Sequence, residues 1–147
     1  GSDTRYIATA VDTKLNPQFL TRWVDETNQG VDDYLSFAES VLSIPQAHKM
    51  VTQYTVLDSE KKALILLRPY QIHAIEAVKA SSRLGKSGFV WHTTGSGKTL
   101  TSYKVARNLL QIASIDKTIF IVDRVDLDQQ TTSSFLSYLE NDVIEID

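Results

Sequence analysis

The string His92-Thr93-Thr94-Gly95-Ser96-Gly97-Lys98-Thr99 constrains the fold of this chain more than any other feature. A glycine-rich turn followed by Lys-Thr is typical of a loop that binds nucleotide phosphates, provided that a strand precedes it and a helix follows. Residues 89–92, Phe-Val-Trp-His, predict a short apolar strand, and residues 98–111 predict a helix. The string therefore lies in the context that a phosphate-binding loop requires.

The residue types in this string suit a triphosphate. Glycine lets successive backbone N–H groups turn towards phosphate oxygens, and the N-terminus of the following helix adds its free N–H groups and its positive dipole end. Lys98 would reach the β- and γ-phosphates, and the Thr99 hydroxyl would bind Mg²⁺. Lys98 and Thr99 are the candidate catalytic residues. The candidate phosphate-binding residues are Thr94, Gly95, Ser96, Gly97, Lys98 and Thr99.

One position departs from the general pattern. The pattern is G-x-x-x-x-G-K-[ST], and His92 stands where its first glycine would be. A chance glycine-rich turn before a helix is the alternative to a phosphate loop, but the strand and helix on either side favour the loop. For His92 itself, a structural role at the end of the strand is favoured over that of a catalytic base.

The order of elements around the loop predicts the fold class. Residues 70–82 predict a helix, residues 119–122 a second buried strand, residues 126–139 a helix and residues 143–146 the start of a third strand. Strands that alternate with helices imply right-handed crossovers and a parallel sheet. We therefore expect an α/β fold of the P-loop NTPase (RecA-like) type, with a partial parallel sheet and flanking helices.

Asp123 follows the second predicted strand and has two readings. An aspartate after four buried residues is typical of a strand that brings a carboxylate to the Mg²⁺ of a nucleotide, as in compact phosphotransferases. The alternative is that Asp123 only ends the strand, because in motor ATPases the metal carboxylates come later in the chain. Sequence spacing leaves both readings open.

The first half of the chain predicts mainly helix. Residues 31–42 carry an apolar stripe that is expected to lie in the core, and Ser43 begins a second helix that runs to about Tyr54 with a capping box and a proline in its first turn. A turn is expected at residues 28–30, and residues 62–67 predict either a short strand or a buried apolar run. The Glu60-x-Lys62 triplet resembles part of a nuclease motif, but a three-residue match is expected by chance.

Composition limits the classes of protein. The absence of cysteine excludes disulfides and cysteine-ligated metals. A net charge of −3 is unlike that of a small basic module that holds nucleic acid by bulk charge. The longest aliphatic run, residues 63–67, is far too short to span a bilayer. The Gly1-Ser2 start leads us to expect a segment of a longer protein.

Three strings together resemble one known family. They are residues 67–71 (Leu-Arg-Pro-Tyr-Gln), residues 91–102 around the loop, and residues 121–130 (Ile-Val-Asp-Arg-Val-Asp-Leu-Asp-Gln-Gln). Together they resemble the motor (R) subunit of type I restriction–modification enzymes, a superfamily 2 helicase-like translocase. Residues 3–6 and 19–23 also resemble that family, which commonly has a histidine at the position of His92.

The resemblance implies roles for further residues. Gln71 would hydrogen-bond the adenine edge of ATP, and Arg68 and Tyr70 would shape or stack against the base. Arg124 would contact the DNA backbone, and Asp123 would then not be the metal carboxylate. Residues 1–67 would be a mainly helical spacer, and residues 68–147 would be the incomplete N-terminal part of the first RecA-like lobe.

The resemblance also implies a function. The chain would be the ATP-binding portion of a cytoplasmic restriction enzyme subunit that translocates double-stranded DNA by hydrolysing ATP with Mg²⁺. The subunit would assemble with modification and specificity subunits and cleave DNA through a nuclease domain outside this chain. The segment alone is expected to be inactive. The alternatives are a small P-loop phosphotransferase with Asp123 supporting Mg²⁺, and a non-catalytic interaction domain with a vestigial loop.

Overall fold

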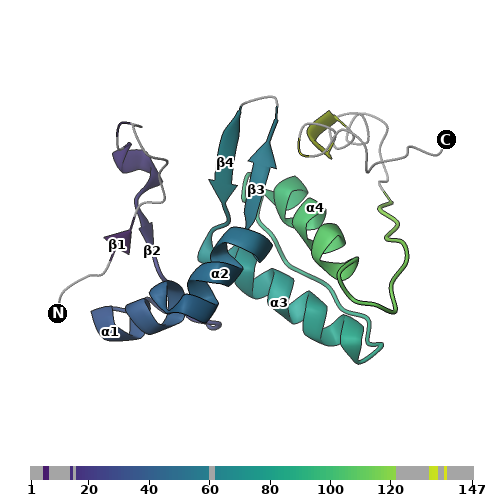
Figure 1. The fold of residues 1–147 in the computed structure, drawn as a ribbon, viewed down its shortest axis with the longest axis horizontal. Coiled ribbons are helices and arrows are strands. Elements are labelled where there is room, and N and C mark those ends of the chain that lie inside the picture. Colours follow the sequence, from purple (N-terminus) through teal and green to yellow (C-terminus); the bar gives the residue numbers. More distant parts are fainter. Residues whose placement is uncertain are drawn as a thin grey trace. The chain divides into compact units, whose positions relative to one another are not determined.

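The computed structural model describes residues 5–6, 14, 16–59, 62–121, 133–135 and 138. The chain divides into two compact units, whose secondary structure is drawn in Figure 1. The first unit comprises Gly1–Thr55 and Leu66–His73, and the second comprises Val56–Ile65 and Ala74–Asp147.

The first unit begins with a small antiparallel sheet. Strand β1 (Arg5–Tyr6) pairs with β2 (Thr21–Arg22), and a 3-10 turn at Pro17–Phe19 precedes β2. After β2, the chain reverses in a tight turn that is closed by a bridge between Val24 and Gly30. The turn predicted at residues 28–30 is thereby confirmed.

Asp25 holds this turn together. Its Oδ1 accepts hydrogen bonds from the backbone N–H groups of Thr27 and Gln29, at 2.8 and 2.9 Å. These hydrogen bonds lower the pKa of Asp25 from its ordinary value, because they favour the charged carboxylate. The turn is therefore stabilised by contacts within five residues of sequence.

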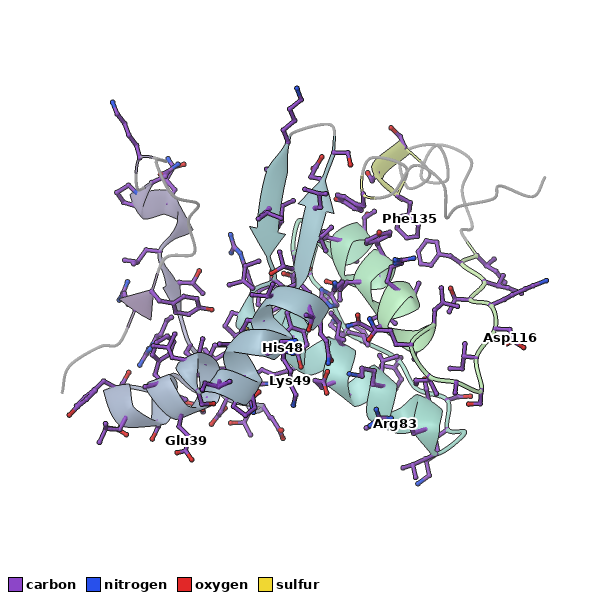
Figure 2. The ribbon with its side chains drawn as sticks, viewed as in Figure 1. Glu39, His48, Lys49, Arg83, Asp116 and Phe135 are labelled. Atoms are coloured by element: carbon purple, nitrogen blue, oxygen red, sulfur yellow. The ribbon has the colours of Figure 1, made fainter. Side chains whose placement is uncertain are left out.

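The helices predicted in the first half are present. Helix α1 (Tyr34–Phe37) continues into a π-helical turn (Ala38–Leu42), and α2 (Ile44–Gln53) follows. The predicted side-chain cap at Ser43 is wrong, because its Oγ donates to the Glu39 carbonyl at 2.8 Å instead of capping α2. The exposed Glu39 side chain is visible in Figure 2.

The apolar stripe of residues 34–42 is mostly exposed, so the prediction that it lies in the core is wrong for most of its members. Val41 is buried, whereas the side chains of Tyr34, Leu35 and Leu42 are 62–65 % exposed. The reason is geometric: α1 has only one turn, and the wider π-helical turn after it breaks the 3.6-residue period on which the stripe depends.

Aromatic rings form the core of the first unit. Trp23 is 6 % exposed, and Tyr6 lies between it and Phe37, with ring centroids 6.4 and 5.3 Å away. Burial raises the pKa of Tyr6 to about 12, since the phenolate would lose its hydration there. The imidazole ring of His73 packs against the indole ring of Trp23, and the two ring centroids are 5.9 Å apart.

The second unit includes most of a two-stranded sheet and a helix that packs on it. Strands β3 (Thr55–Asp58) and β4 (Ala63–Leu66) form a hairpin, which confirms the strand predicted at residues 62–67 (Figure 1). Val56 of this hairpin, Tyr103 of α4 and Phe135 form a buried cluster. Figure 2 labels Phe135, whose ring meets that of Tyr103 edge-on at 5.4 Å.

The two long helices also agree with the sequence. Helix α3 spans Pro69–Arg83 and α4 spans Lys98–Leu109, within two residues of the predicted boundaries. Gly85, with φ of +63°, ends the turn that follows α3, where its N–H donates to the Ser82 carbonyl. A proline at the start and a glycine beyond the end explain why the boundaries of α3 could be predicted.

The predicted strands on either side of α4 are not formed among the described residues. Neither residues 89–92 nor residues 119–121 are paired in a sheet, and Val122 lies outside the described part. Phe89, Trp91, Ile119 and Ile121 are 87–89 % exposed. The N–H and C=O groups of a parallel strand pair with those of a neighbouring strand that is distant along the chain. The parallel sheet therefore stays a prediction.

The predictions for the C-terminal part are covered only in places. Residues 133–135 and 138 are helical, in agreement with the helix predicted over residues 126–139. The remainder of that helix and the strand predicted at residues 143–146 lie outside the described residues. None of the helices in the described part of the chain has the length and apolarity needed to cross a membrane.

Candidate phosphate-binding loop

The loop of residues 92–99 leads directly into α4. Gly95 and Gly97 have φ angles of +74° and +79°, in the left-handed region that other residues rarely adopt. Gly97 is also the N-cap of α4. The sequence therefore has glycine at the two positions where this backbone path demands it.

The N-terminus of α4 carries the charged and hydroxyl side chains of the motif. No side chain caps this helix at its N-cap, which is a glycine. Lys98 is the first helical residue and is exposed, and Thr99 is half-buried. An exposed lysine beside an uncapped helix N-terminus places positive charge and N–H donors in one region, which is a favourable environment for an anion.

Hydrogen bonds within the loop close a turn between residues 93 and 96. The Ser96 hydroxyl donates to the Thr93 carbonyl at 2.7 Å, and the Ser96 backbone N–H points to the same oxygen at 3.3 Å. His92 Nδ1 lies 2.9 Å from the Ser96 Oγ. Sequence reasoning assigned His92 to the end of a strand and missed this contact, although the i to i+4 spacing could have suggested it.

The loop is fastened to α4 by Thr101, which the sequence analysis also missed. Its backbone N–H and its Oγ1 both donate to the Gly97 carbonyl, each at 3.0 Å. Thr101 is buried, so this double contact is shielded from water. The exposed Thr94 and Gly95 thus lie inside the turn that the Ser96–Thr93 hydrogen bonds close, and Thr101 holds the Gly97 carbonyl at the start of the helix.

The residues proposed to contact adenine lie in the first unit, at the start of α3. Gln71 is 4 % exposed, and its Oε1 accepts the backbone N–H of Arg68 at 2.9 Å. The Arg68 carbonyl in turn accepts the N–H of Gln71, as expected for the residue that precedes a helix. Tyr70 is half-buried and Arg68 is exposed. The structure thus gives Gln71 a helix-capping role that the sequence analysis did not foresee.

A cavity of about 300 Å³ lies beside α4 in the second unit. Most of its wall is apolar, with His92, Lys98, Thr101, Ser102 and Thr118 as the polar exceptions; the apolar residues are Ala74, Val78, Val90, Val105, Ala106, Leu109, Ile119 and Phe120. Apolar walls do not satisfy phosphate oxygens. The cavity is therefore not the phosphate site, and it lies where the two unpaired apolar segments run past α4.

Burial shifts the pKa values of two side chains of α4, Lys104 and Tyr103. Burial lowers the pKa of Lys104 from its ordinary value, and the positive charge of Arg107 lowers it further. Burial also raises the pKa of Tyr103. Both residues lie on the packed side of α4, away from its first turn. Desolvation penalises the charged form of each group, which explains both directions.

Several candidate residues lie outside the described part. These are Asp123, Arg124, and Glu60 of the short nuclease-like triplet. Across the ranges that the structure describes, no three His, Cys, Asp or Glu side chains are grouped closely enough to hold a metal ion.

Comparison with known proteins identifies the family. The family model described as "Type III restriction enzyme, res subunit" matches residues 64–146, more than half of the chain. The endonuclease subunit of a type I restriction enzyme from Staphylococcus aureus (strain COL) is 40 % identical over 144 residues, 97 % of this chain. A corresponding subunit from Staphylococcus saprophyticus is 38 % identical over the same length.

A shorter relative also matches. It is the C-terminal part of a putative type I restriction enzyme endonuclease subunit from Mycoplasma pneumoniae. The two are 36 % identical in an alignment 135 positions long, which covers 84 % of this chain and 65 % of the relative. By contrast, the chain spans 15 % of the length of the staphylococcal relatives. The resemblance to type I restriction enzyme subunits is confirmed, and the family implies a P-loop helicase-like fold. The chain belongs to the restriction enzyme family of the type III res subunit, and its relatives are endonuclease subunits of type I restriction enzymes.

Proposed function

We propose that this chain is the ATP-binding portion of a type I restriction enzyme subunit that hydrolyses ATP to translocate double-stranded DNA. Cleavage would take place in a nuclease domain outside the chain. The observation that carries the proposal is the glycine loop with its two left-handed residues, which opens directly into α4 at Lys98 and Thr99. The 40 % identity to the endonuclease subunit of a type I restriction enzyme supports the proposal that this loop acts within such a subunit.

The loop residues fit a bound triphosphate with Mg²⁺. The turn of Thr94, Gly95, Ser96 and Gly97 carries no bulky side chain, so a phosphate chain could approach its backbone, and Lys98 adds a point charge for the terminal phosphates. The Thr99 hydroxyl would hold Mg²⁺, which when bound offsets negative charge on the phosphates. Lys98 stabilises charge during phosphoryl transfer, and the loop orients the phosphate chain for in-line attack.

Base recognition is assigned to the start of α3. Gln71 is the residue proposed to read the adenine edge, with Arg68 and Tyr70 beside the base. The capping bond from Arg68 N–H fixes the amide so that Oε1 faces the helix backbone. Arg124 is the proposed phosphate contact to DNA. The partners are double-stranded DNA and the modification and specificity subunits, in the cytoplasm.

The chain by itself is expected to hydrolyse essentially no ATP. Phosphoryl transfer depends on the simultaneous placement of the nucleotide, an activated water and charge-stabilising groups. The chain spans 15 % of its staphylococcal relatives, and the acidic motor motif and second lobe that the family implies are not among its motifs. A domain boundary near residue 67 is part of the same proposal.

The test is an ATPase assay on the full-length subunit with and without double-stranded DNA. Lys98→Ala should abolish DNA-stimulated hydrolysis, because the charge that neutralises the terminal phosphates is lost. Lys86→Ala is the matched control, since Lys86 is an exposed lysine in the connector after α3. Unchanged hydrolysis in Lys98→Ala would support an interaction domain with a vestigial loop. Phosphorylation of a small acceptor without DNA would support the phosphotransferase alternative with Asp123.

A further inference from the structure

The contact between His92 and Ser96 determines which ring nitrogen of His92 carries its proton. The Ser96 hydroxyl has one hydrogen, and it donates that hydrogen to the Thr93 carbonyl at 2.7 Å. In the 2.9 Å contact with His92 Nδ1, the Ser96 Oγ must therefore accept. An acceptor oxygen requires a donor, so the neutral His92 ring carries its proton on Nδ1.

His73 gives an internal comparison for this assignment. Its Nε2 lies 2.8 Å from the Val24 carbonyl oxygen, which can only accept. The neutral His73 ring therefore carries its proton on Nε2, the tautomer that also predominates in free histidine. The hydrogen-bond partners thus assign opposite tautomers to the two neutral rings, and only the one assigned to His92 differs from the form that predominates in free histidine.

We propose that His92 is a positioning residue that presets the phosphate loop before nucleotide arrives. The inference rests on the nucleotide-binding function proposed above. The Nδ1–H of His92 fixes the Ser96 Oγ, which in turn fixes the Thr93 carbonyl, so that one relay spans the turn immediately before Gly97. A loop with left-handed glycines at two positions has high conformational freedom. A relay that removes part of this freedom in advance lowers the entropy lost on binding.

This role explains the departure of the chain from the general phosphate-loop pattern. A glycine at position 92 would have no side chain to reach Ser96, whereas an imidazole reaches four residues along the chain. His92 is half-buried and lines the cavity beside α4, so its contact with Ser96 is partly shielded from water, whereas the bond from Ser96 to Thr93 is exposed.

The first test is spectroscopic and uses this chain above the pH at which its histidines are charged. The chain has three histidines, at positions 48, 73 and 92, so the ¹⁵N signals of the rings can be assigned by substitution. We expect one ring to show a protonated Nδ1, and this pattern should vanish in His92→Asn while the Nε2–H pattern of His73 remains. A His92 ring protonated on Nε2 would overturn the proposal, because the single Ser96 hydroxyl hydrogen would then point to His92 Nδ1 and not to the Thr93 carbonyl.

The second test measures Mg-ATP affinity in the full-length subunit. His92→Ala and Ser96→Ala should each weaken binding by about five- to tenfold, as expected for the loss of one hydrogen bond. The double variant should bind Mg-ATP with the same affinity as the single variant that binds it less tightly, because each substitution removes the same relay. His92→Asn keeps an amide donor near the Nδ1 position and should stay within about twofold of the wild type.

The outcomes separate the two proposals. A wild-type subunit that binds no nucleotide would overturn the proposed function, and this inference with it. If the wild type binds and Lys98→Ala does not, the proposed function stands. In that case, unchanged affinity in His92→Ala, additive losses in the double variant, or an equal loss in His92→Asn and His92→Ala would each overturn the positioning role alone. Equal thermal midpoints for His92→Asn and the wild type show that any change is local.

Discussion

Helix α4 and the apolar segments on either side of it differ in how far their side chains are buried. Thr101, Tyr103 and Lys104 of α4 are buried. In the two segments, residues 89–91 and 119–121, four of the six side chains are 87–89 % exposed. All of these residues belong to the second unit. The residues of the two segments are all apolar, whereas Thr101 and Lys104 are polar or charged, so hydrophobicity alone does not decide which part of a chain is packed.

The difference lies in where backbone hydrogen bonds find their partners. A helix closes its bonds within four residues, so α4 forms wherever its sequence favours it. A parallel strand depends on segments that are distant along the chain. Val90 and Phe120, at 46 % and 48 %, are less exposed than their neighbours, so each segment keeps the two-residue alternation of a strand. Helix α4 is therefore packed, whereas the two segments have strand-like sequences but no paired strand among the described residues.

The largest expected effect tests the packed side of the comparison. Tyr103→Ala should lower the free energy of unfolding by about 3 kcal/mol, because it empties the cluster with Val56 and Phe135. Trp91→Ala removes a larger ring that is 88 % exposed and should change stability by less than about 0.5 kcal/mol. Urea unfolding of the chain measures both values. A loss of equal size for Trp91→Ala would show that the segment is packed and would remove the contrast.

A second, smaller effect on stability tests whether the loop before α4 needs glycine at position 95. Gly95→Ala should destabilise the chain by about 1 kcal/mol, since a Cβ meets nothing within 4 Å and only the positive φ is unfavourable. Gly85→Ala has the same kind of φ and the same open space, so it should cost a similar amount. Only Gly95→Ala should also weaken nucleotide binding. Gly88→Ala, in open space, serves as the control for stability.

The smallest effect concerns the buried lysine of α4. The folded state lowers the pKa of Lys104 below its ordinary 10.5, mainly through burial. Between the lowered pKa and 10.5 the unfolded chain binds more protons than the folded chain, so the free energy of unfolding should rise with pH across that window. Lys104→Met should abolish this rise and stabilise the chain at neutral pH.

Stability curves at several pH values from 7 to 11 measure this slope. The exposed Lys86→Met is the matched control and should follow the wild-type profile. An unchanged slope in Lys104→Met would show that Lys104 is hydrated in the folded chain. That result would weaken the description of α4 as the packed partner in the comparison.

Local sequence signals predicted much of the fold. The proline before α3, the glycines of the loop and the Lys-Thr start of α4 each act within a few residues, and the helices appear where these signals place them. The stripe of residues 34–42 failed as a core prediction, since a π-helical turn changed the rotation of its side chains. Periodicity predicts which face is apolar only while the helix keeps its regular pitch.

The candidate site shows the same division. The glycine conformations at residues 95 and 97 followed from sequence, whereas the capping role of Gln71 and the relay from His92 to Ser96 did not. Each of these contacts depends on a side-chain direction, and residue identity alone does not supply that direction. The i to i+4 spacing was visible beforehand, but the partner of each polar atom was not.

The sequence by itself determined the helices, the glycine-dependent loop and the family, because these depend on residues that are close together in the chain. Only the tertiary structure decided which apolar side chains were buried, that His92 contacts Ser96, and that Thr101 bonds to the Gly97 carbonyl. The physical reason is that burial and hydrogen-bond partnership are properties of neighbours in space. For residues 89–91 and 119–121, neighbouring strands decide whether the strand pattern in their sequence becomes a sheet.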